Sequence, residues 1–184
     1  MKRAKDGEYR KTPMKKVKVQ SGSHDFKDAI ELMFFSYRDF ISDPDAILQK
    51  HGFGRAHHRV LHFVGCNPGL SIANLLNILR VTKQSLARVL RELIDEGYIN
   101  QKIGVHDRRK RLLFLTAKGH KLHDNLIAPQ IGRFEQVAAE VDTATFNSWK
   151  QVMRLVINPA DRENVDHLIA TSRKAKSLAP EQKE

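Results

Sequence analysis

The 184-residue sequence contains a single cysteine and no long run of apolar residues. One cysteine, Cys66, excludes an intrachain disulfide and is typical of a protein in a reducing compartment. A helix that crosses a membrane needs about 20 consecutive apolar residues, and no stretch of this chain approaches that length. The basic N-terminus is not followed by the apolar stretch of a signal peptide. We therefore expect a cytoplasmic protein with no membrane partner.

The sequence also lacks the short motifs that carry common enzyme chemistry. It has no glycine-rich phosphate-binding loop, no helix with the paired histidines of a metalloprotease and no nucleophile elbow. These absences predict that the protein is not an enzyme. We also expect no cofactor, and no metal ion, because the histidine pairs of the sequence have no nearby cysteine and no clear set of carboxylates.

Positive charge is concentrated in two parts of the chain. Residues 1–20 contain eight Lys and Arg against two Asp and Glu, and residues 82–118 contain nine against four. The stretches 21–81 and 119–184 are each neutral. Because an even spread of charge would serve solubility alone, two basic segments beside neutral ones favour a polyanionic partner.

The two ends of the chain differ from the rest in pattern. Residues 1–22 have many charges and little hydrophobic periodicity, so we expect a disordered basic tail there. Residues 173–184 are predicted to form a second disordered tail. The remaining residues, 23–172, have enough apolar side chains for a packed core and are expected to form a single domain.

The first part of this domain has apolar residues three or four positions apart, which indicates an amphipathic helix over about 25–42. Asp43 and Pro44 are predicted to end this helix, because proline lacks a backbone donor and disfavours a helical residue before it. A second helix is expected over 55–64, ahead of a break at 67–69.

Two short capped helices follow. Ser71 is a favourable N-cap for the first helix and Thr82 for the second, which we expect to close at Gly97. The apolar residues of the second helix recur at helical spacing and predict a buried stripe, which comprises Leu86, Val89, Leu90, Leu93 and Ile94. Gln84, Arg88 and Arg91 fall on the opposite face.

The hydrophobic period then changes from helical to alternating. Residues 98–103 and 110–116 are each predicted to form a short strand, and 104–107 suit the connection of a hairpin. Thr116 is a candidate cap for the next helix, over 117–139. Pro129 is expected to kink or break that helix, since proline costs about 3 kcal/mol in a helix interior.

Two further helices are predicted near the C-terminus. One has apolar residues at helical spacing, namely Phe146, Trp149, Val152, Met153 and Val156. The other is a last short helix. It is predicted from Asn158, a favourable N-cap, and from Pro159, a proline suited to the first turn.

The helix pair and the basic hairpin together form a plausible DNA-reading unit, because the major groove of DNA admits one helix. Arg88 suits two hydrogen bonds to a guanine and Gln84 suits an adenine edge, each worth about 1–3 kcal/mol of discrimination. The residues of the second helix that we expect to contact DNA are Thr82, Lys83, Gln84, Ser85, Arg88 and Arg91.

The tip of the hairpin, residues 106–111, places four consecutive cations beside one carboxylate. A narrow minor groove has a strongly negative potential that attracts arginine, so this tip suits a contact with the minor groove. Asp107 lowers the local charge, and we interpret it as a residue that orients a neighbouring arginine through a charge-assisted hydrogen bond. The hairpin residues that we expect to contact DNA are Asp107, Arg108, Arg109 and Lys110.

The stretch LSIANLLNILRVTKQSLARVLRELIDEGYINQKIGVHDRRKRLLFLTAKG, from Leu70 to Gly119, resembles the winged helix-turn-helix core of the MarR family of bacterial regulators. The resemblance rests on the helix pair, on Asp107-x-Arg109 and on the closing Leu115, Thr116, x, x, Gly119. It implies a mainly α fold with a small β-hairpin wing. It also implies a core over about 55–119, dimerisation helices over about 25–42 and 117–172, and Arg109 in the minor groove supported by Asp107.

The same resemblance implies a function: a homodimeric transcription regulator, such as a repressor, bound to double-stranded DNA at a palindromic operator and able to respond to a small-molecule effector. Two reading helices in a two-fold dimer would contact half-sites about 34–36 Å apart. The sequence departs from the family at Arg80, where a glycine is usual. This predicts an adjusted turn or an added phosphate contact. The first 22 residues and the segment after Asn158 also exceed the usual length.

Other functions stay open at this point. His58 and His62, four apart, and His120 and His123, three apart, each offer a metal ion two ligands, and Cys66 offers a thiol for redox sensing. A metal- or redox-sensing regulator is therefore one alternative. The other is a winged helix that binds a protein rather than DNA.

Overall fold

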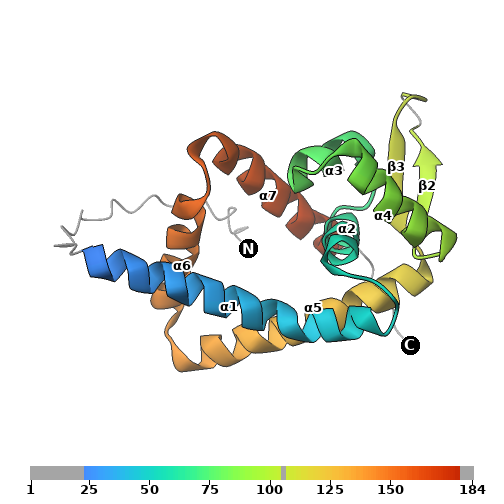
Figure 1. Cartoon of the computed structure of the whole chain (residues 1–184). Coiled ribbons are helices and arrows are strands. Elements are labelled where there is room, and N and C mark those ends of the chain that lie inside the picture. Colours follow the sequence, from blue (N-terminus) through green and yellow to red (C-terminus); the bar gives the residue numbers. More distant parts are fainter. Residues whose placement is uncertain (1–22, 105–106, 179–184) are drawn as a thin grey trace, which may run out of the picture. The chain divides into compact units, whose positions relative to one another are not determined.

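The computed structural model describes residues 23–104 and 107–178. It is mainly helical with one small sheet, which confirms the predicted fold class. The elements, in chain order, are α1 (Ser23–Gln49), α2 (Arg55–Cys66), β1 (Leu70–Ser71), α3 (Ile72–Leu79), α4 (Lys83–Asp95), β2 (Ile99–Ile103), β3 (Arg111–Leu115), α5 (Ala117–Glu140), α6 (Thr143–Val156), η1 (Pro159–Asp161) and α7 (Arg162–Leu178) (Figure 1). The chain divides into two compact units, Met1–Ser36 and Tyr37–Glu184, and the boundary lies within α1.

Helix α1 continues past Asp43 and Pro44, so the predicted end of this helix is wrong. Pro44 is fully buried, and its missing N–H leaves the carbonyl of Phe40 without the usual helical donor. The side-chain Nε2 of Gln130 donates to that carbonyl oxygen at 3.5 Å. Burial of the ring and a substitute hydrogen bond from a distant helix therefore allow the helix to pass through the proline.

Helix α5 likewise runs without interruption through Pro129, so of the predicted kink or break the break is wrong. Leu122 and Leu126 are buried on the N-terminal side of the proline, and Gln130 is buried directly after it. Packing of this face outweighs the local cost of the proline. Thr116 caps the helix as predicted, because its side chain accepts a hydrogen bond from the backbone N–H of Gly119 at 3.0 Å.

The sheet has three antiparallel strands in the order β1-β3-β2. In the β2–β3 hairpin Ile99 lies opposite Leu115, and Leu70 of β1 lies opposite Leu113. Both hairpin strands were predicted to within one residue at each end. Strand β1 was not predicted, since two residues are too few to show alternation.

The core of the second unit surrounds α2, which contacts α3, α4, α5, α7 and β3. Its most deeply buried side chains are apolar and come from seven elements: Leu48, Leu61, Leu75, Leu86, Leu93, Ile99, Leu113 and Leu126. Because the helix pair and the hairpin share this core, the position of α4 relative to the wing is set by packing on both elements.

The C-terminal part forms more helix than the sequence predicted. Pro159 begins η1, and α7 then runs for 17 residues, so residues 173–178 of the expected tail are helical. Helix α7 packs on α2, where Ser172 Oγ donates to Asn67 Oδ1 at 3.0 Å. The expected tail at 1–22 and residues 179–184 lie outside the described part of the chain. Among the described residues, no helix is both long and apolar enough to span a membrane.

Candidate nucleic-acid interface

Helix α4 has one buried and one exposed face, as predicted. Its N-cap is Thr82, whose Oγ1 accepts a hydrogen bond from the backbone N–H of Ser85 at 3.1 Å. Leu86, Val89, Leu90 and Leu93 are buried, and Ile94 is half-buried beside them. The predicted contact residues Thr82, Lys83, Gln84, Ser85, Arg88 and Arg91 are all exposed.

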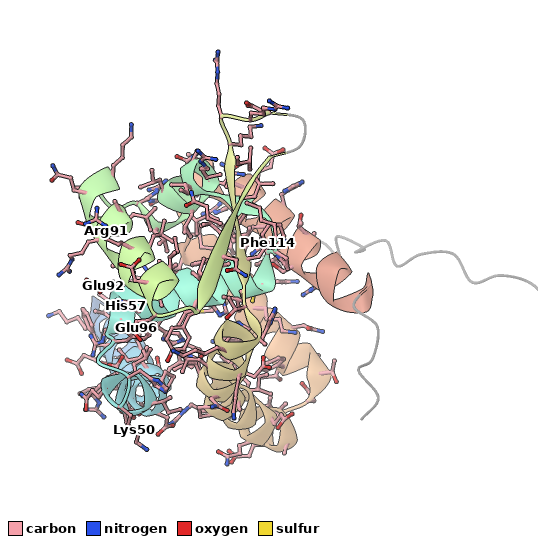
Figure 2. The ribbon with its side chains drawn as sticks, turned by 90° about the vertical axis from the view of Figure 1, so that its right-hand side faces the viewer. Lys50, His57, Arg91, Glu92, Glu96 and Phe114 are labelled. Atoms are coloured by element: carbon pink, nitrogen blue, oxygen red, sulfur yellow. The ribbon has the colours of Figure 1, made fainter. Side chains whose placement is uncertain are left out.

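A hydrogen-bonded pair fixes α4 against α2. His57 Nδ1 accepts from the backbone N–H of Gly54 at 3.2 Å, so its Nε2 carries the proton that is donated to Glu92 Oε2 at 2.6 Å. Figure 2 shows His57 and Glu92 next to each other, and Phe53 stacks on the His57 ring with 4.5 Å between centroids. Sequence reasoning missed this pair, because no local pattern links residues 35 positions apart.

The turn between α3 and α4 is built on Arg80, which adopts a left-handed backbone conformation with φ of 51°. Its backbone N–H donates to the Leu76 carbonyl, and Arg59 donates to the Leu79 carbonyl at 3.0 Å. The Arg80 guanidinium pairs with Asp161 of η1. Arg80 thus adopts the left-handed backbone conformation that glycine favours, and its side chain has an intramolecular partner.

The wing turn is organised by Asp107. Its Oδ1 accepts from the backbone N–H of Arg109, and its carbonyl accepts from the backbone N–H of Lys110, both at 3.0 Å. The Asp107 carboxylate thus bonds to a neighbouring arginine, as the sequence analysis inferred, and the donor is the backbone N–H of Arg109. Short carboxylates commonly stabilise turns in this way. Arg108, Arg109 and Lys110 are exposed, and His106 lies outside the described residues.

A hollow of about 470 Å³ lies between the wing turn and the start of α3. Its lining includes Ser71, Ile72 and Asn74 from the helix start and Arg109, Lys110 and Arg111 from the wing. Backbone N–H groups and the positive end of the helix dipole meet basic side chains here, an arrangement suited to a phosphate group.

Charge is unevenly distributed along α4. Its cations Lys83, Arg88 and Arg91 occupy the first three turns, whereas Asp95 and Glu96 stand at its C-terminal end. Figure 1 shows α4 beside the wing strand β2, and the two elements are in contact. The ten residues predicted from the sequence therefore lie on α4 and the wing turn as expected, with the basic end of α4 exposed.

A helix-turn-helix followed by a β-hairpin, which forms a three-stranded sheet with a short strand before the helix pair, defines the winged helix-turn-helix class of protein. The MarR family sequence pattern matches residues 51–110. The transcriptional regulator PetP of Rhodobacter capsulatus is 42% identical over 142 residues, which cover 77% of this chain and 86% of PetP. The chain therefore belongs to the MarR family, and it is a transcription regulator of that family rather than an enzyme.

Two solved structures show the same fold. FabT of Streptococcus pneumoniae, crystallised in complex with DNA, aligns with a TM-score of 0.59 at 15% identity over 73% of this chain and 94% of FabT. A mutant MarR of E. coli, complexed with operator DNA, aligns with a TM-score of 0.55 at 16% identity over 75% of this chain and 99% of that protein.

Proposed function

We propose that this protein is a homodimer that binds double-stranded DNA at a palindromic operator and regulates transcription from it. The observation that carries the proposal is the exposed, basic N-terminal half of α4 beside a wing tip of exposed cations. The major groove of DNA is wide enough to admit an α-helix, and an arginine at the wing tip suits the adjacent minor groove.

Each part of this surface has a different task in the proposal. Gln84 and Arg88 contact base edges, and Lys83 and Ser85 contact phosphates beside them. Arg109 enters the minor groove, positioned by the Asp107 turn. A phosphate occupies the hollow between the wing turn and α3. The structural similarity to FabT and to E. coli MarR, both solved with DNA, supports this assignment.

The proposed dimer rests on apolar side chains that the chain itself leaves exposed. Helix α6 has no buried residue, yet Trp149, Val152, Met153 and Val156 form a stripe at helical spacing along it. In the first unit, Phe26 and other apolar residues of α1 are also exposed. Monomeric proteins seldom expose contiguous apolar patches of this kind, so we assign these faces to a second copy of the chain.

Dimerisation also gives a route to regulation. Both reading helices must enter successive major grooves at once, so a small-molecule effector that changes their spacing would release the DNA. Occupation of an operator that overlaps a promoter would make the protein a repressor.

The test is selection of bound duplexes from a random pool by the full-length protein. We expect a palindromic motif with half-sites about 34–36 Å apart. Affinity for the selected duplex should fall by about 10³–10⁵ between 50 and 200 mM salt, because basic side chains displace counterions from phosphates. Failure to bind any duplex at low salt would overturn the proposal in favour of a winged helix that binds protein.

A further inference from the structure

Helices α2 and α5 bring three metal-ligating side chains together. His62 and Cys66 lie one turn apart on α2, with His62 Nε2 4.0 Å from Cys66 Sγ, and His123 of α5 lies against them. One potential ligand atom from each residue lies within 4.8 Å of those of the other two. The sequence analysis had paired these histidines differently, His58 with His62 and His120 with His123, and had treated Cys66 separately.

The donor set and its spacing fit a tetrahedral metal site. Imidazole nitrogen and thiolate sulfur are the ligands that Zn²⁺ prefers in proteins, at about 2.0–2.1 and 2.3 Å. Tetrahedral angles at those bond lengths separate the ligand atoms by about 3.3–3.6 Å. The three atoms therefore need to close by roughly 1 Å, which side-chain rotation supplies.

The ring of His123 is oriented as a metal-binding histidine usually is. Its Nδ1 lies 3.3 Å from Asp124 Oδ1, and its Nε2 is turned towards α2. A carboxylate on the far nitrogen fixes the tautomer and raises the basicity of the nitrogen that binds metal. The ring approaches α2 at Gly65, where a Cβ would lie 2.7 Å from His123 Cδ2. Glycine at position 65 therefore leaves the space that the ring fills.

The site adjoins a hollow of about 250 Å³ between α2 and α7. The hollow is lined by His62 and Cys66 of α2, by Asn67 directly after that helix, and by Leu168 and Ser172 of α7, among others. Three protein ligands leave one tetrahedral position, and water or a small ligand can reach it from this hollow.

We propose that His62, Cys66 and His123 form a binding site for a divalent transition-metal ion of the zinc type, with Asp124 as the carboxylate that orients His123. Helix α7 covers this site.

The same C-terminal segment reaches the turn before α4 through the Asp161–Arg80 pair, and it is bonded to the end of α2 through Ser172 and Asn67. A metal ion that draws α2 and α5 together therefore acts on the segment that contacts the helix-turn-helix, a coupling that rests on the proposed function.

The site is tested with the full-length protein after treatment with a chelator, using Co²⁺ as a spectroscopic probe and Zn²⁺ as competitor. We expect one Co²⁺ per chain, a thiolate-to-metal charge-transfer band, and loss of that band when Zn²⁺ is added. Bound Zn²⁺ should also slow alkylation of Cys66 by iodoacetamide.

Four variants distinguish a metal-binding site from three side chains that lie close together without binding metal. Cys66→Ser should lose the charge-transfer band, and His123→Gln should bind Zn²⁺ at least about 10-fold more weakly. Gly65→Ala removes no ligand but displaces the His123 ring, so it should weaken Zn²⁺ binding while its far-UV circular dichroism stays that of the wild type. His120→Gln, on the same helix as His123 but outside the cluster, is the control and should bind as the wild type does.

The proposed site is wrong if His123→Gln and Gly65→Ala both bind Zn²⁺ as tightly as the wild type does. It is also wrong if the wild type with Co²⁺ shows no charge-transfer band. The coupling has a separate readout, the affinity for the selected duplex with and without Zn²⁺. If Zn²⁺ changes the DNA affinity of the wild type but not that of Cys66→Ser, the coupling is supported. If the wild type binds DNA equally well with and without Zn²⁺, the coupling is wrong, and the metal site still stands. Because metal binding is measured without DNA, failure of the DNA-binding proposal leaves these metal measurements intact.

Discussion

Arg80 and Asp161 form an ion pair that connects the turn of the helix-turn-helix to the segment after α6, across 81 positions of sequence. Among the described residues, Arg80 is the only non-glycine residue with a positive φ. A glycine would adopt this backbone conformation at lower cost. Arginine at this position instead supplies a side chain that links the DNA-reading unit to η1.

Exchanging Arg80 for glycine should therefore change stability little. Arg80→Gly relieves a left-handed conformation that costs about 1 kcal/mol and loses a largely exposed ion pair worth about 0.2–1 kcal/mol. Asp161→Asn loses the pair alone and should lower the free energy of unfolding by up to about 1 kcal/mol. Urea denaturation of both single variants and the double variant measures the coupling. If Asp161→Asn destabilises Arg80→Gly as much as it does the wild type, the two side chains do not interact in solution.

Substitutions of Arg88 and of Arg80 should have different effects on DNA binding. Arg88→Ala should weaken binding to the selected duplex by about 1–3 kcal/mol and relax the preference at one base position in each half-site. Arg80→Ala should leave the salt dependence of binding unchanged, because Asp161 already holds the guanidinium away from phosphate. Fluorescence anisotropy at several salt concentrations gives both quantities. A salt slope that falls by about one in Arg80→Ala would assign a phosphate contact to this residue after all.

The wing tip should contribute to affinity and not to stability. Arg109→Ala should weaken DNA binding while leaving the melting temperature unchanged, since the Arg109 side chain is exposed. Asp107→Ala should produce part of the same loss, because it removes the bond that positions the Arg109 backbone. Thermal unfolding and anisotropy measured on the same preparations separate the two effects. A large fall in melting temperature with unchanged affinity per folded molecule would contradict this role.

The apolar stripe of α6 should hold the dimer together. Met153→Glu places a charge within the stripe and should shift the protein towards monomer, because a buried unpaired charge is costly. Gln151→Glu adds the same charge on the opposite side of the helix and serves as the matched control. Sedimentation velocity across a range of concentrations distinguishes the two species. Unchanged association in Met153→Glu would exclude this face from the interface.

The Arg154–Asp166 pair should give stability a dependence on acid pH. Arg154 donates to both carboxylate oxygens of Asp166 and so holds the pKa of Asp166 below its usual value. A carboxyl group with a lowered pKa in the folded state stabilises that state above its unfolded pKa of 3.8, and the effect is lost as pH falls through the folded pKa. The difference in melting temperature between wild type and Asp166→Asn should therefore shrink as pH falls from 5 to 3. A constant difference would show that the pair contributes nothing through this charge.

Local patterns predicted the part of the fold that makes the proposed interface. The caps Thr82 and Thr116 act where the sequence placed them, and the exposed face of α4 follows from the spacing of its apolar residues alone. These features depend on residues within a few positions of one another, so the sequence carries them directly.

The errors arose where distant parts of the chain decide the outcome. Gln130 provides the hydrogen bond that lets α1 pass through Pro44, and burial on both sides of Pro129 keeps α5 continuous. The Arg80–Asp161 pair joins residues 81 positions apart, and His123 reaches Cys66 only because α5 packs on α2. Spacing along the chain gives no sign of such contacts, since tertiary packing creates them.

Contact between α4 and DNA is tested most directly by site-specific photocrosslinking. A crosslinker is placed at Gln84→Cys or, as control, at Lys50→Cys, both in the Cys66→Ser background; Lys50 is exposed and lies far from the wing in Figure 2. The expected result is that position 84 crosslinks to bases within each half-site of the selected duplex and position 50 does not. Crosslinking from position 50 with none from position 84 would contradict a DNA-reading role for α4.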